Sequence, residues 1–202
     1  MAANVKEIVQ EVSEMIGDTE LERITKEQVL ILINASARDL IGAGLVIGLT
    51  DNESLSAGSG SLIVVPTKFA YIHDIWGGTS FQTWMPHSHW SFQIVSSAPN
   101  ILFDSELQSI SSGSIQLNGH ARPTTGYLIS ATAVDIGFES FIRVRTGSYA
   151  AQQLAQISEG AAAANLEGIS NKAMQESNEL LQLLGTQPHF RPNRYSRAVP
   201  LR

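Results

Sequence analysis

The sequence predicts an α+β protein with N-terminal helices and a long C-terminal helix packed together, a central antiparallel β-sandwich or barrel-like domain, and an extended C-terminal tail. Three observations predict this class. Apolar residues recur at helical spacing near both ends, short β-branched and aromatic runs fill the middle, and prolines interrupt the last stretch. These features divide the 202 residues into parts at 1–48, 49–147, 148–186 and 187–202.

Two helices are predicted in the N-terminal part. The first covers residues 4–16, where apolar side chains recur at i, i+3, i+4 and i+7. The second begins after Thr25, because Thr25 and Gln28 form a capping-box pattern, and Ile24 and Val29 are spaced as a hydrophobic staple. This second helix is apolar on several sides, which indicates burial in a core or against other subunits.

The central part has the composition of a β domain. Residues 50–61 read as a loop because they are polar and rich in glycine and serine. Turn residues then separate six candidate strands, at 61–66, 80–86, 89–95, 114–119, 126–130 and 141–146. In the last of these, Ile142 and Val144 alternate with Arg143 and Arg145, which indicates a strand with one face in water.

A long helix is predicted from Tyr149 to Leu184, ended by Gly185 and Pro188. About half of its predicted contact face consists of alanine and serine, and small residues allow another helix to approach closely. The residues of this face are Ala162, Leu166, Ile169, Ala173, Ser177, Leu180 and Leu184.

Charge is distributed unevenly along the chain. The formal net charge is −6, yet the segment from His189 to the end holds four of the 13 basic residues, and no acid follows Glu179. Residues 1–30 carry seven acids against three bases. Ends of opposite sign suit assembly between neighbouring subunits, whereas the overall acidity argues against a nucleic-acid-binding surface.

Composition also limits the compartment and the chemistry. Cysteine is absent, so disulfides and thiol chemistry contribute nothing. No apolar run reaches about 18 residues and the first residues lack the pattern of a secretory signal, so no membrane partner is expected. An intracellular or particle-assembled protein fits this composition.

The strongest metal-binding pattern is His87-x-His89. On a strand both imidazoles point to the same side, and His73 and His120 could join them in space. However, zinc sites use three or four ligands, and no HExxH motif or cysteine is present. Histidines in a strand or turn are therefore the favoured interpretation; no metal, no other cofactor and no enzymatic activity is expected.

Five aromatic residues gather in a short stretch of the β region. They suit a carbohydrate-stacking platform, but the core of a small β domain is the favoured interpretation because aromatic side chains bury the most area. The five are Trp76, Phe81, Trp84, Trp90 and Phe92.

Three motifs occur in a recognisable order. They are I-T-x-E-x-V at residues 24–29, P-x-x-F-x-x-I at residues 66–72, and Gly119, Arg122, Pro123 and Tyr127 in a G-x-x-R-P hairpin with one residue more than usual before the tyrosine. With the Ala/Gln-rich helix and the Arg-rich tail that follow, the chain resembles head-to-tail adaptor (connector) proteins of tailed bacteriophages over most of residues 20–197.

The resemblance implies a structural virion protein of the neck, made in the host cytoplasm. Such proteins form a ring, usually of twelve copies, beneath the portal protein; the other face of the ring receives a tail or nozzle protein, and DNA passes through only as cargo. The tail is then an arm that becomes ordered on docking. By position, the portal-docking residues are Phe190, Arg191, Arg194, Tyr195 and Arg197.

The β region is larger than a minimal helical adaptor needs, so an inserted domain with its own contacts is expected. Two alternatives remain open from the sequence. One is a tail- or surface-associated β module that binds glycan through Trp76, Trp84 and Trp90, and the other is a metal-dependent hydrolase that uses His87 and His89.

Overall fold

The computed structural model describes residues 4–55, 62–77, 83–104, 113–129 and 133–200. The chain forms two compact units. The helical unit combines residues 1–45 with 123–187, and the β unit combines residues 46–122 with 188–202. The predicted boundaries of the β domain, 49–147, therefore extend too far at their C-terminal side.

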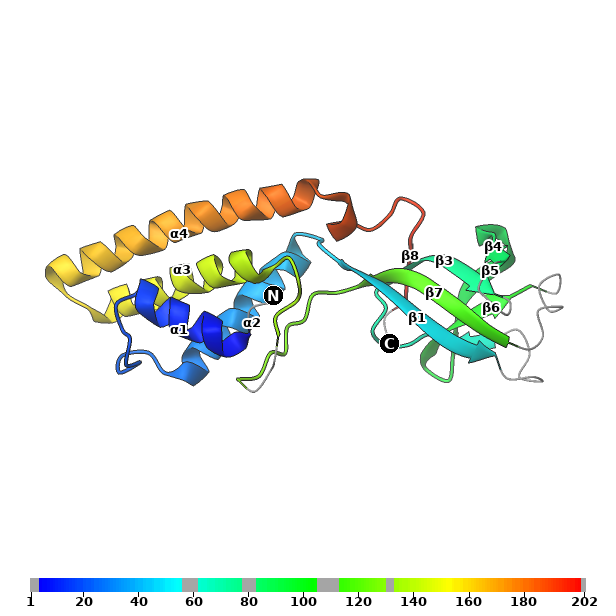
Figure 1. The fold of residues 1–202 in the computed structure, drawn as a ribbon, viewed down its shortest axis with the longest axis horizontal. Coiled ribbons are helices and arrows are strands. Elements are labelled where there is room, and N and C mark those ends of the chain that lie inside the picture. Colours follow the sequence, from blue (N-terminus) through cyan, green and yellow to red (C-terminus); the bar gives the residue numbers. More distant parts are fainter. Residues whose placement is uncertain (1–3, 56–61, 78–82, 105–112, 130–132, 201–202) are drawn as a thin grey trace. The chain divides into compact units, whose positions relative to one another are not determined.

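The helical unit contains α1 (Val5–Met15), α2 (Lys26–Gly42), α3 (Glu139–Ile157) and α4 (Gly160–Thr186), as Figure 1 shows. Both N-terminal helices are confirmed. Thr25 caps α2, since its hydroxyl accepts from the amide of Gln28 while the Gln28 side chain accepts from the amide of Thr25. No helix among the described residues is both long and apolar enough to cross a membrane.

Helix α3 lies at the centre of the helical unit, in contact with α1, α2 and α4. The strand predicted at 141–146 is therefore wrong, because these residues belong to α3. A helix covered on several sides is buried nearly all round, so its apolar pattern loses the helical period. The single predicted C-terminal helix is also two helices, divided at the extended residues Ser158 and Glu159 before Gly160, whose φ is +59°.

Small residues join α3 to α4, as the composition of the predicted face suggested. The hydroxyl of Ser148 donates to the carbonyl of Ser170, and the hydroxyl of Ser170 donates to the carbonyl of Ser148, each at 3.0 Å. Side chains this short let the two backbones approach closely. Of the predicted face, Leu166, Ala173, Ser177 and Leu184 are buried, whereas Ala162 is exposed.

A buried charge lies in the same unit. Arg145 is only 8% exposed, and its Nε lies 3.1 Å from Oδ2 of Asp39 on α2. The guanidinium also donates to Asn178 on α4, and the hydroxyl of Tyr149 donates to Asp39 at 2.6 Å. Burial, with the Asp39 carboxylate beside it, raises the pKa of Tyr149 to about 12, so this hydroxyl remains a donor at neutral pH.

The β unit consists of two antiparallel sheets. One has the strand order β1-β7-β3-β4, with β8 also pairing with β3, and the other has the order β2-β6-β5. The strands are β1 (Ile47–Leu55), β2 (Leu62–Val64), β3 (Tyr71–Gly77), β4 (Thr83–Met85), β5 (Trp90–Val95), β6 (Ala98–Phe103), β7 (Gly113–Ala121) and β8 (Arg197–Ala198).

One apolar core lies between the two sheets. Both contribute to it, with Ile72, Ile75, Met85, Ile115 and Leu117 from the first and Ile63, Trp90, Ile101 and Phe103 from the second. No pairing between described strands links the sheets, so this part of the chain is a sandwich and not a closed barrel. The α+β class is confirmed.

Strand β1 was missed because its sequence is polar. β1 pairs with β7 over a continuous nine-residue register, which includes residues 50–55 of the predicted loop, while residues 56–61 lie outside the described part. Polar groups meet across the strands: Thr50 donates to Asn118, and Gln116 donates to Asn52. The predicted strand at 126–130 is also wrong, because its described residues, 126–129, form no strand.

Candidate functional site

The candidate site is the C-terminal strap, which we define as residues 188–200. It begins with a turn of 3-10 helix, η3 (Pro188–Phe190), and ends with β8, which pairs with Tyr71 and Ile72 of β3. The carbonyl of Phe190 accepts from the amide of Val46, and the amide of Val199 donates to the carbonyl of Ala70, both at 2.9 Å. The predicted extended tail is therefore folded, at both ends, onto the β unit of its own chain.

Arg197 fastens the strap to the sandwich. Its guanidinium lies over the Trp90 indole, with Cζ 4.5 Å from the ring centroid, and donates to the carbonyls of Trp90 and His87. A cation over a buried indole, with donors directed at backbone carbonyls, is a strong anchor. Trp90 and Arg197 are 107 residues apart in sequence, so no local pattern predicts their contact.

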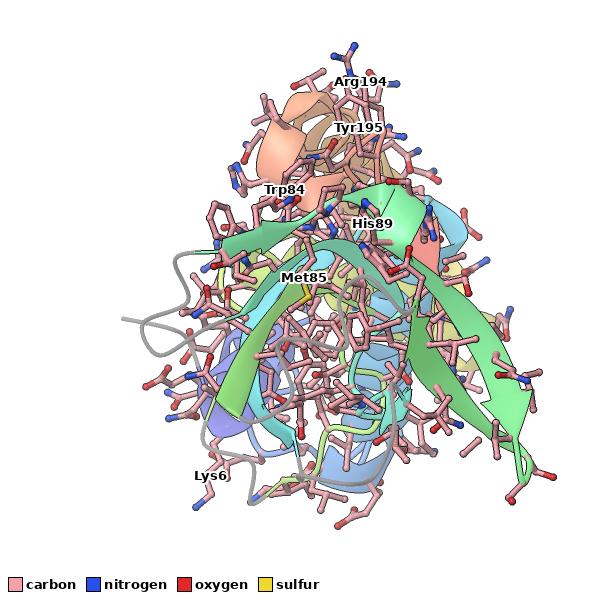
Figure 2. All side chains as sticks on the ribbon, turned by 90° about the vertical axis from the view of Figure 1, so that its right-hand side faces the viewer. Lys6, Trp84, Met85, His89, Arg194 and Tyr195 are labelled. Atoms are coloured by element: carbon pink, nitrogen blue, oxygen red, sulfur yellow. The ribbon has the colours of Figure 1, made fainter. Side chains whose placement is uncertain are left out.

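Residues 191–196 form an arch between the two anchors. The side-chain oxygen of Asn193 accepts from the backbone amide of Tyr195 at 3.2 Å, and the backbone carbonyl of Asn193 accepts from the amide of Ser196 at 2.7 Å. This turn directs Tyr195 outward, where the side chain is 58% exposed, with the guanidinium of Arg194 4.7 Å from its ring centroid. Figure 2 shows both side chains pointing away from the strands.

The structure thus divides the five predicted docking residues into two groups. Phe190 is 7% exposed and Arg197 is half-buried against Trp90, so both are engaged within the chain. Arg191, Arg194 and Tyr195 lie on the exposed arch. Only the latter group presents side chains that a partner can contact without the strap leaving its seat.

The two histidines proposed as metal ligands do not share a strand face. His87 and His89 form a 3-10 turn, η1 (His87–His89), so the i, i+2 argument does not apply. Nδ1 of His89 lies 2.6 Å from Oδ2 of Asp104, and the His87 ring lies 5.1 Å from that of Trp90. Among the described residues, no group of three or more His, Asp or Glu side chains is arranged to hold a metal ion.

The aromatic cluster does not form one platform. Trp90 is buried in the core between the sheets, as the core interpretation requires. Trp76 and Trp84 are paired neighbours on β3 and β4, and Trp84 is 46% exposed, with its indole N–H donating to Asp74 at 3.2 Å. Phe81 lies outside the described residues.

No family model matches the sequence, and no curated protein is similar to it.

Proposed function

We propose that this protein is a head-to-tail adaptor of a tailed bacteriophage. Copies of the chain form a ring between the portal and a tail or nozzle protein, and DNA crosses its channel. The adaptor class rests on the order of the sequence motifs and parts. The observation that carries the docking role is the exposed Arg194–Tyr195 pair, held on an arch whose two ends are anchored.

The motifs behind the resemblance occupy positions that hold this fold together. Ile24 and Val29 are buried at the start of α2, and Phe69 and Ile72 lie in the sandwich core. Gly119 lies where a Cβ atom would be only 2.1 Å from the carbonyl oxygen of Tyr71. These motif residues are therefore needed for the fold itself. This supports the family resemblance at the level of the fold.

Tyr127 of the third motif is hydrogen-bonded to α2 within the helical unit. Its backbone amide donates to the Asn34 side chain at 2.8 Å, and its carbonyl accepts from the same side chain at 3.2 Å. The residue after it, Leu128, is 63% exposed, and Ile31, one helical turn before Asn34 on α2, is 64% exposed. Exposed aliphatic side chains on adjoining segments suit contacts between neighbouring copies in a ring.

The chemistry of the arch favours an acidic protein partner. Arginine and tyrosine are enriched among the residues that dominate binding energy at protein interfaces. A guanidinium binds carboxylates in a bidentate manner, and stacking on Tyr195 keeps it oriented. Because the whole chain carries a net charge of −6, binding to the phosphates of DNA is opposed by repulsion.

The experiment is co-sedimentation of purified adaptor with portal rings. The double variant Arg194→Ala/Tyr195→Ala is expected to lose at least about 30-fold in affinity, since even one hot-spot residue contributes about 2 kcal/mol. Trp84→Ala is the matched control, because it removes another exposed aromatic side chain of the same unit, on β4 and not on the strap. Unchanged co-sedimentation of the double variant would refute docking through the arch.

Two further measurements test the rest of the proposal. The mass of the assembled particle neck gives the number of copies, for which twelve is expected. Glycan-array binding that disappears in Trp84→Ala would instead favour the carbohydrate-binding module, since Trp84 is the most exposed tryptophan in the described part of the chain.

A further inference from the structure

Two imidazoles lie side by side next to the seat of the strap. The ring centroids of His73 on β3 and His120 on β7 are 5.1 Å apart. Ile115 and Leu117 of β7 point into the core, so the alternation along the strand places His120 on the opposite face of the sheet. His120 is nonetheless only 6% exposed, and the His73 side chain is 22% exposed.

The strap is bonded to this part of the sheet. Its residue Val199 donates to the carbonyl of Ala70, and the amide of Ala70 donates in turn to the carbonyl of His120 at 2.8 Å. In the antiparallel pairing of β8 with β3, Arg197 faces Ile72. Ser196 of the arch immediately precedes Arg197, and His73 immediately follows Ile72.

Three polar side-chain atoms of β3, β7 and the arch are buried without a hydrogen-bond partner in the protein. They are Nδ1 of His73, Nδ1 of His120 and Oγ of Ser196. Buried polar atoms are nearly always bonded, and a charge added among them would be more costly still. These surroundings therefore stabilise the neutral form of both imidazoles and destabilise the protonated form.

The charged groups around the pair act in the same direction, with one exception. Burial lowers the pKa of His73, and His87 from η1 lowers it further, whereas Asp74, with its carboxylate 3.6 Å from Nε2, raises it. Burial and the neighbouring His73 both lower the pKa of His120. Arg197 of β8 carries a permanent positive charge, and its guanidinium donates to the backbone carbonyl of His87.

We propose that His73 and His120 form a pH-sensitive latch that keeps the strap seated while both rings are neutral and releases it when they are protonated. The latch follows from the geometry of the β unit alone. Its consequence, control of docking by the arch, rests on the proposed function. The ligand-free protein therefore tests the latch separately from the portal experiment.

The sign of the pH dependence follows from linkage. The released state titrates near the ordinary histidine pKa of about 6.5, and the seated state titrates lower. The seated strap is therefore fully stabilised above about pH 6.5, and stability is lost as the pH falls below it. At pH 5.5 the opening equilibrium rises by up to about tenfold for each histidine, and by up to about 100-fold for the pair.

Hydrogen exchange of the strap, corrected for the intrinsic effect of pH, measures this opening. We expect protection of the Val199 amide to fall between pH 7.5 and pH 5.5, by up to about 100-fold, while protection in α3 stays constant. In the double variant His73→Gln/His120→Gln, protection is expected to stay level with pH. His189→Gln, which removes an exposed imidazole of the strap itself, is expected to behave like the wild type.

Two results would overturn the latch: wild-type protection that does not change between the two pH values, or a double variant that still loses protection at pH 5.5. If the double variant fails to fold, the wild-type profile still decides, because the latch requires the strap to open while the core amides of β7 remain protected. Simultaneous loss in both regions refutes it.

Discussion

Replacing Gly119 with alanine tests the strand register on which the β unit depends. An ideal Cβ at this position would lie 2.1 Å from the carbonyl oxygen of Tyr71, 2.9 Å from Cδ1 of Phe69 and 3.1 Å from Cα of Ile72. Two of these three atoms belong to the backbone of the β3 segment, so they cannot rotate away. Gly119→Ala must therefore push β3 and β7 apart.

The expected cost is at the upper end of the range for overpacking, about 3 kcal/mol. For a unit of this size, such a loss lowers the melting temperature by at least about 10 °C. Thermal and urea unfolding followed by circular dichroism measure it. Gly48→Ala is the control: Gly48 lies on the neighbouring strand opposite His120, and its added methyl group meets no atom within 4 Å. Equal stability of the two variants would show that β3 does not approach β7 in this register.

Two more substitutions test the strap and the buried charge. Phe190→Ala is expected to destabilise the β unit by about 3 kcal/mol, because it removes a buried aromatic side chain. His189→Ala, at the exposed neighbouring residue, is expected to change the stability little. Urea unfolding midpoints compare the two variants, and similar midpoints would contradict the anchoring role of Phe190. Arg145→Ala is expected to cost the helical unit about 3 kcal/mol, since it leaves Asp39 without its cation in a partly buried place. Arg143→Ala removes an exposed ion pair and is expected to cost less than about 1 kcal/mol; an equal loss in both arginine variants would argue against the buried pair.

Local signals predicted the start of α2 but not the end of α4. Gly185, expected to end the long helix, lies inside α4, which continues to Thr186. The capping box at Thr25 is confirmed, because it depends on only a few neighbouring residues. The sequence pattern predicted the wrong element where burial on several sides removed the helical period of apolar residues. Ile142 and Val144 seemed to alternate with arginines, but Arg145 is itself buried against Asp39, so the alternation did not separate an inner face from an outer one.

The candidate site was predictable in composition but not in arrangement. The run of arginines and aromatics marks the segment that forms the strap, and it includes the exposed pair Arg194 and Tyr195. Which side chains are used inside the chain depends on contacts such as that of Arg197 with Trp90, which no local spacing reveals. The sequence likewise indicates His73 and His120 only as extra metal ligands. Their position beside the strap follows from the pairing of β3 with β7 and β8, which no local pattern predicts.

The anchored arch changes the expected energetics of docking. A free tail that becomes ordered on a partner loses roughly 1–2 kcal/mol of backbone entropy for each residue fixed. In this chain the arch is already held by Phe190 at one end and by β8 at the other, with an internal turn at Asn193. Folding of the β unit has therefore fixed most of this segment before any partner arrives. A preorganised arch needs fewer contacts for the same affinity, so in the proposed ring of many copies an exposed pair as small as Arg194 and Tyr195 is sufficient for docking.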